Sequence, residues 1–166
     1  KYVRAITEQS QKPNPTLLFY RGDHRQPQHE VKPGGLTVAA AADSPLMITD
    51  NDPNLPSSGR RLAYARYLTS GRHPLVARVL ANRFWMLHFG KGLVSTTGEF
   101  GKLGTTPSNP ELLDWLADEF MSKGWSLKHL HRVIMRSEAY RRSSRETETN
   151  KESDPSNKLL WRQNLQ

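Results

Sequence analysis

The sequence predicts a mainly α fold: a small helical bundle of four to five helices, preceded by an extended N-terminal arm that contains one or two short strands. Two observations support this prediction. Apolar residues recur at helical spacing through residues 57–142, between residues that are typical of helix caps. Residues 1–56, by contrast, are rich in turn-forming residues and contain one short run of β-forming residues. The length of 166 residues fits one domain with an appended segment.

The β-forming run of the arm covers residues 16–20, and a turn at residues 21–23 ends it. This turn has the sequence Arg-Gly-Asp, the tripeptide of integrin ligands, but a match of three residues has little specificity. We expect Asp23 to cap a turn, because aspartate side chains accept nearby backbone hydrogen bonds. We expect Arg21 to pair locally.

The helical body, residues 57–142, begins with two helices. Ser57 and Ser58 are good N-caps for the first helix, and Gly71 ends it. The second helix follows Pro74, and its apolar residues recur at steps of three and four. Gly90 stands where a left-handed C-cap residue belongs, so the second helix is expected to end there.

The part of the body with the clearest signals for helix starts and ends is the segment 108–142. Asn109 is a good N-cap for a third helix that has Pro110 at its first position, and Ser126 caps a fourth helix after a turn at Gly124. Two helices joined in this way resemble a DNA-reading helix-turn-helix. The caps and the glycine turn are also generic to any αα-hairpin, so we favour the structural interpretation over nucleic-acid binding.

Residues 143–166 predict a polar linker followed by the start of a helix. Asp154 before Pro155 is typical of an N-cap and a first helical position, so a helix is expected from residue 157 onward. That helix would run directly into the end of the chain. We therefore expect the chain to be a fragment of a larger protein.

The composition limits the classes of site that the chain can hold. It has no cysteine, which excludes disulfides, cysteine-based zinc sites and a covalently attached c-type haem within these residues. No run approaches the roughly 20 apolar residues of a membrane-spanning helix. We expect no cofactor within this chain and no membrane span.

The charge is positive and unevenly distributed. The formal net charge is +8, and residues 60–102 contain eight basic residues against one acidic residue. A basic surface attracts nucleic acids, anionic lipids or acidic polysaccharides. We favour the ordinary interpretation, in which many of these arginines pair with the acidic third helix or with other parts of the protein. Among anionic partners, the acidic polysaccharide is the candidate that we retain.

No residue pattern forms a recognisable active site, so the catalytic residues stay unknown and the sequence leaves open whether the chain is an enzyme. The densest cluster of polar and aromatic residues lies on the second helix, at Asn82, Arg83, Trp85 and His88. Arg83 falls among apolar positions, and burying an unpaired guanidinium is costly. We therefore expect it to pair with Glu99 or with a loop carbonyl.

A metal site at His129 and His131 is not expected. Residues two positions apart on a helix point about 200° apart, so the two rings lie on opposite faces and do not share one ion. Helical metal-binding pairs use a spacing of four. We predict no metal site.

Several segments together resemble one large family of exported proteins of planctomycetes and related bacteria. The segments are RGDHRQP (21–27), SGRRLAYARYLTSGRHPLVARVLANRFWMLHFGKGLV (58–94), GEFGKLGTTPSNPELLDWLADEF (98–120), GWSLKHLHRVIMRSEAYR (124–141) and DPSNKLLWRQN (154–164). Members of that family join a c-type cytochrome module to two domains of unknown function, and this chain is similar to the C-terminal one. The family often has histidine where this chain has Asn109.

The resemblance implies an exported or periplasmic location, other domains of the same polypeptide as partners, and a c-type haem elsewhere in the full-length protein. It supplies no reaction. Seven of its recurrent positions are candidate ligand-binding residues, and we add two from the sequence itself, His88 and Glu99. The seven are Arg21, Asp23, Asn82, Arg83, Trp85, His131 and Arg132.

We therefore expect an accessory domain that binds a partner domain or an acidic glycan through a basic face. Two alternatives stay open. In the first, the domain completes a redox or hydrolytic active site together with other domains, through Arg83, His88, Glu99 and His131. In the second, it is a nucleic-acid-binding module of the helix-turn-helix type.

Overall fold

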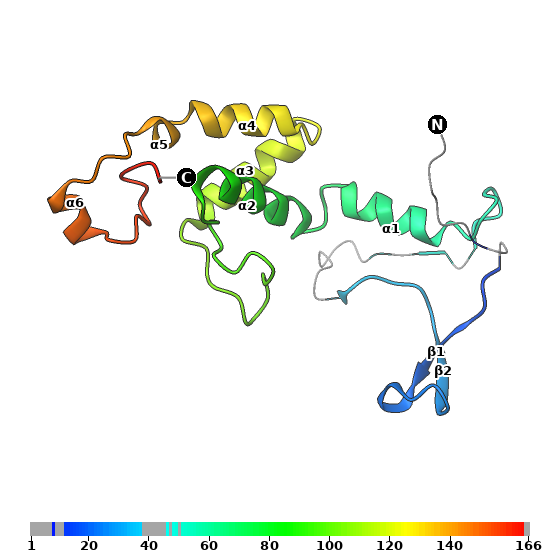
Figure 1. The fold of residues 1–166 in the computed structure, drawn as a ribbon. Coiled ribbons are helices and arrows are strands. Elements are labelled where there is room, and N and C mark those ends of the chain that lie inside the picture. Colours follow the sequence, from blue (N-terminus) through cyan, green and yellow to red (C-terminus); the bar gives the residue numbers. More distant parts are fainter. Residues whose placement is uncertain (1–7, 9–11, 38–45, 47, 50, 165–166) are drawn as a thin grey trace, which may run out of the picture. The chain divides into compact units, whose positions relative to one another are not determined.

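A computed structural model gives the fold (Figure 1) and describes residues 8, 12–37, 46, 48–49 and 51–164. The chain divides into two units, Lys1–Pro74 and Leu75–Gln166. Within the described residues, the first unit holds a two-stranded sheet and one α-helix, and the second holds five α-helices. The mainly α fold with N-terminal strands, as predicted from the sequence, is confirmed.

The sheet of the first unit pairs β1 (Thr16–Phe19) with β2 (Pro27–Val31) in an antiparallel hairpin. Both strands are short and mostly exposed, so the hairpin has little apolar area to bury. A 3₁₀ turn, η1 (Tyr20–Gly22), follows β1 directly, as the Arg-Gly-Asp sequence predicts.

The turn between the strands is held by Asp23. Its carboxylate accepts hydrogen bonds from the backbone N–H of Arg25 at 3.0 Å and from the side-chain amide of Gln26 at 3.1 Å. The guanidinium of Arg21 lies over the ring of Tyr20, 5.3 Å from its centroid. Asp23 therefore has the turn-capping role expected of it, and Arg21 has a local partner.

Helix α1 (Arg60–Thr69) begins later than predicted, after Gly59 in the left-handed conformation with φ of 78°. Ser58 does not cap it in the usual way, because it is buried against Glu8. The Glu8 carboxylate accepts from the Ser58 backbone N–H at 2.6 Å and from its hydroxyl at 2.8 Å. The boundary between the units follows α1, whereas the sequence groups this helix with the body.

The second unit is built on α2 (Val76–Phe89), α3 (Pro110–Ser122) and α4 (Leu127–Arg136). Their ends are where the capping residues predict them. The side chain of Asn109 accepts from the backbone N–H of Leu112 at 3.0 Å, and that of Ser126 accepts from His129 N–H at 3.3 Å. Gly90 ends α2 in the left-handed conformation. Two short helices, α5 (Glu138–Arg141) and α6 (Glu148–Ser153), follow α4.

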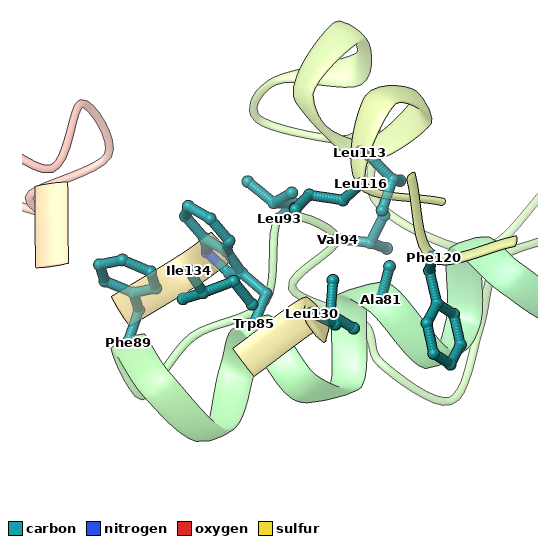
Figure 2. Close-up of a cluster of buried hydrophobic side chains, with 10 residues drawn as sticks. All are labelled: Ala81, Trp85, Phe89, Leu93, Val94, Leu113, Leu116, Phe120, Leu130 and Ile134. Atoms are coloured by element: carbon teal, nitrogen blue, oxygen red, sulfur yellow. The ribbon is translucent and has the colours of Figure 1, made fainter. Parts of the chain in front are cut away.

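The core of the second unit lies between α2, α3 and α4 (Figure 2). Each helix contributes one stripe, and the segment that follows α2 closes the cluster with two aliphatic side chains. The cluster consists of Ala81, Trp85, Phe89, Leu93, Val94, Leu113, Leu116, Phe120, Leu130 and Ile134. Leu127, which the helical pattern places inside, is 44% exposed because it lies at the first turn of α4.

A buried amide fixes the segment after α2 to the helix. Asn82, which is 1% exposed, donates to the carbonyl of Val94 at 3.0 Å and accepts from the N–H of Val94 at 2.9 Å. The chain passes so close to this amide that a Cβ at Gly92 would lie 2.6 Å from the Val94 oxygen and 2.8 Å from the Asn82 amide. Asn82 is therefore a structural residue, and Gly92 is required where it stands.

The helix expected from residue 157 is not formed; residues 157–164 make successive turns, and α6 occupies part of the predicted linker. The prediction is wrong because Asp154 caps a turn rather than a helix. Its carboxylate accepts from the backbone N–H groups of Lys158 at 3.0 Å and Leu159 at 2.8 Å. Asn157 and Leu160 then take positive φ angles of 51° and 55°, which a right-handed helix excludes.

Replacing Asn82 with alanine is expected to lower the free energy of unfolding by about 3 kcal/mol, because both polar groups of Val94 would stay buried without a partner. Urea denaturation followed by circular dichroism measures this loss. The control is Asn109→Ala, which removes an exposed cap and should cost about 1 kcal/mol. Equal losses in the two variants would contradict the role given to the buried amide.

Candidate functional site

A cleft of about 550 Å³ opens in the second unit, beside the C-terminal end of α2. Four parts of the chain line it: the last turns of α2, the segment 91–95, the segment 105–108 and the turns of 156–164. This volume is within the range typical of small-ligand sites, about 300–1,000 Å³. We refer to it as the α2 cleft.

The floor of the α2 cleft is apolar and belongs to the core. Trp85 and Phe89 line it with their rings stacked, at 4.2 Å between centroids and 26° between planes. Leu93 adjoins them from the segment after the helix, and Leu160 adjoins them from the C-terminal turns. All four residues contribute to the hydrophobic cluster or pack against it, so the floor is rigid.

Two lysines line the α2 cleft, Lys91 next to the cap of α2 and Lys158 on the C-terminal turns. Both are exposed, and neither forms a hydrogen bond or salt bridge through its side chain with a residue that the structure describes. The nearby Asp154 carboxylate acts on Lys158 electrostatically, and its oxygens are engaged by backbone N–H groups instead. The two ammonium groups are therefore available to an anion.

Hydroxyl groups line another part of the cleft. The hydroxyls of Ser95 and Thr105 lie 2.9 Å apart and share a hydrogen bond, and Thr105 N–H donates to the hydroxyl of Thr96 at 3.0 Å. Thr106, Ser108 and Ser156 add further hydroxyls. These short side chains donate and accept, so they suit a ligand that carries many hydroxyl groups.

The wall formed by 156–164 is held by side-chain amides. Asn157 is buried and donates to the carbonyl of Arg162 at 2.8 Å and to the side-chain oxygen of Asn164 at 3.1 Å. Asn164 in turn donates to the carbonyl of Phe89, which attaches the wall to the end of α2. The backbone N–H groups of Leu159 and Lys158 lower the pKa of Asp154, which keeps its carboxylate charged at the start of the wall.

Next to this wall, two of the predicted site residues meet. The Nε2 atom of His88 on α2 and the Nδ1 atom of His131 on α4 are 2.7 Å apart, a hydrogen-bond distance. Burial lowers the pKa of His88, and the charge of His131 lowers it further. The Tyr140 ring lies edge-on to His88, with 5.4 Å between the centroids.

The two histidines of α4 lie on opposite faces of the helix, as their spacing predicts. His129 contacts Glu119 of α3 at 2.6 Å, whereas His131 contacts α2. In the described part of the chain, no group of three or more histidine, aspartate or glutamate side chains is placed to hold a metal ion. In the same residues, no helix is long and apolar enough to cross a membrane.

The other predicted site residues do not join the histidines. Arg83 is exposed on the solvent side of α2 and forms no hydrogen bond or ion pair with a described residue, so its expected burial and pairing are wrong. The Glu99 carboxylate accepts from the N–H of Gly101 at 2.8 Å within its own loop. Arg132 is exposed on α4, and Arg21 and Asp23 belong to the other unit. Trp85 is the one predicted candidate that lines the α2 cleft.

The polar residues of the cleft are not among the residues predicted from the sequence. Lys91 and Lys158 are ordinary charged residues in sequence, and no motif marks them. Asp154 followed by Asn157 is a spacing that favours turns, and it could have warned against a helix there. Nothing in the sequence indicates that this turn lies against the end of α2.

Comparison with known families identifies the helical part of the chain. A model described as PSD1, protein of unknown function (DUF1553), matches residues 60–166. The chain belongs to the DUF1553 family. The match begins at the first residue of α1 and includes every residue that lines the α2 cleft, so the cleft lies within the DUF1553 domain. No curated protein matches the chain. No solved structure matches it either.

Replacing Asp154 with alanine should speed amide hydrogen exchange at Lys158 and Leu159 several-fold, because the carboxylate that accepts from both N–H groups is lost. Because the folded pKa of Asp154 is lowered, its stabilising effect is present above about pH 4 and is lost as the pH falls through the folded value. The control is Glu152→Ala, which removes an exposed carboxylate two residues away. If both variants exchange alike, Asp154 does not hold the wall.

Proposed function

We propose that this DUF1553 domain is an accessory ligand-binding module and that the α2 cleft holds a segment of an acidic glycan. The observation that carries the proposal is the pair of lysines, Lys91 and Lys158, which line one cleft without a salt bridge to a described residue. A carboxylate or sulfate would find two ammonium partners there, and hydrogen bonds to charged groups are the stronger ones.

The rest of the cleft supports the choice of a glycan over a small inorganic anion. The hydroxyls of Ser95, Thr105, Thr106, Ser108 and Ser156 line the same cleft as the lysines. A sugar ring carries several hydroxyls that donate and accept, which this lining matches. The cleft volume of about 550 Å³ exceeds what a lone anion fills and suits a ligand of a few sugar rings.

The wider setting is also a proposal. We infer that the domain works in an exported, cytochrome-linked protein and contacts other domains of that polypeptide. The support is the sequence resemblance described above, together with the family membership. In such a protein the cleft would bring the glycan to a reaction that another domain performs.

The two alternative functions have less support. Of the four residues of the proposed composite active site, His88 and His131 meet, whereas Arg83 faces solvent and Glu99 bonds within its loop. Helix α4 packs through Leu130 and leaves its basic residues exposed, which is compatible with nucleic-acid binding but is also the usual state of a solvated helix face. A duplex DNA is therefore included in the binding test.

Titration calorimetry with trigalacturonate is expected to show binding that weakens as the salt concentration rises, because exposed charge pairs are screened. The uncharged maltotriose should bind at least about tenfold more weakly. Lys91→Ala and Lys158→Ala should each cost about tenfold in affinity. The wall uses the backbone of Lys158 and not its side chain, so truncation leaves the wall in place.

The matched control is Lys128→Ala, which removes an exposed lysine of α4 that does not line the cleft. Its affinity for trigalacturonate should equal that of the wild-type protein. Equal loss in all three lysine variants would indicate a diffuse basic surface, and the cleft would not be the site. Tighter binding of duplex DNA than of trigalacturonate, lost in the Lys128 variant, would favour the nucleic-acid alternative.

A further inference from the structure

We propose that His88 and His131 form a proton-operated latch, which holds the C-terminal wall of the α2 cleft in place at neutral pH and releases it at acidic pH. The effect on ligand binding rests on the function proposed above, whereas the release of the wall does not. The residues that line the cleft include no histidine and no acidic residue, so the latch would regulate the site from outside.

The geometry of the pair makes it sensitive to protons. At 2.7 Å, one ring nitrogen donates a hydrogen bond and the other accepts it. A first added proton leaves that bond in place, because one nitrogen still has a lone pair. A second proton makes both facing nitrogens donors and both rings positive, so the hydrogen bond is replaced by repulsion. The two protonation steps belong to the pair as a whole.

The latch and the wall share the last turn of α2. The carbonyl of His88 accepts from the side-chain amide of Gln163 at 3.5 Å, and the carbonyl of the next residue, Phe89, accepts from Asn164. Asn164 lines the cleft. A displacement of His88 would therefore move both of these acceptors, and it would also move Phe89 in the floor. The wall has further contacts on its other side, where Arg142 donates to the carbonyl of Leu160 at 3.0 Å and Arg162 pairs with Glu146 at 3.1 Å.

The groups around the pair come from three elements. Helix α5 contributes Tyr140, whose ring is edge-on to His88 at 5.4 Å and to Phe89 at 5.9 Å. Helix α2 contributes Phe84, edge-on to His131 at 5.2 Å, and the C-terminal turns contribute the neutral amide of Gln163. Glu119, an acidic residue of α3, contacts His129 instead. In the described residues, burial and His131 are what shift the pKa of His88.

The direction of the pH effect follows from this shift. The folded pKa of His88 lies below the ordinary value of about 6.5, so the folded protein binds fewer protons than the unfolded protein below that pH. Stability is therefore fully retained above about pH 6.5 and falls as the pH drops toward the folded pKa.

Hydrogen exchange of the whole chain, measured from pH 7.5 to 5 and corrected for intrinsic rates, tests the latch. Protection of residues 156–164 should fall at least about threefold below pH 6 in the wild-type protein, while α3 keeps its protection. In the double variant His88→Gln/His131→Gln, which lacks both imidazole rings of the latch, the protection of the wall should not depend on pH.

The matched control is His129→Gln, which removes a histidine of the same helix that faces α3 and should leave the pH response intact. The ring resonances of His88 and His131 in the wild-type protein give a measurement that needs no variant. They should shift in the same pH interval as the loss of protection. A wall whose protection is independent of pH, or depends on pH equally in the double variant, would overturn the latch.

Trigalacturonate affinity at pH 7.5 and 5.5 completes the test. It should fall at least about threefold at the lower pH in the wild-type protein and in the His129 variant, but not in the double variant. If the wall is released as described and trigalacturonate does not bind at any pH, the proposed function is wrong and the latch stands. If trigalacturonate binds and the wall does not respond to pH, the latch is wrong and the function stands.

Discussion

The buried amide of Asn82 is the constraint on which the second unit depends. A helix that ends in a glycine cap leaves the direction of the following chain open, and the two hydrogen bonds to Val94 remove that freedom. They turn the chain back along α2, so that Leu93 and Val94 enter the core between α2 and α3. Without this return, the α2 cleft would lack one of its walls.

The parts of the α2 cleft are positioned by this core. The core fixes Trp85 and Phe89, these aromatic rings become the floor of the cleft, and the carbonyl groups at the end of α2 receive the amides of the C-terminal turns. The rigid part of the domain therefore supplies the apolar surface, and the loops supply the charge and the hydroxyls. This division between scaffold and loops is common in binding proteins.

Local rules predicted most of the fold. The N-caps at Asn109 and Ser126 and the C-cap at Gly90 need only a few residues of context, and all three are confirmed. The predictions that failed concern segments whose structure depends on contacts with residues distant in sequence. Ser58 forms hydrogen bonds with Glu8, 50 positions away, and does not cap α1 as predicted. The C-terminal turns contact the end of α2, which is 75 positions away. Periodicity does not report contacts at such separations.

The site was predicted less well than the fold, for the same reason. The sequence marks Asn82 and His131 as candidates for ligand binding, but it does not show that the amide of Asn82 bonds to Val94 and that His131 is a partner of His88. Arg83 was expected to be buried because its neighbours in sequence are apolar. On a helix with a partly exposed face, sequence neighbours do not share an environment.

The position of Lys91 between two glycines separates the demands of the fold from those of the proposed ligand. Gly90 needs its positive φ of 75°, and Gly92 has no room for a Cβ, so the fold restricts both positions to glycine. Lys91 is exposed, and nothing in the described core depends on its side chain. A substitution at this one position would therefore change the charge of the cleft while the backbone that presents it is preserved.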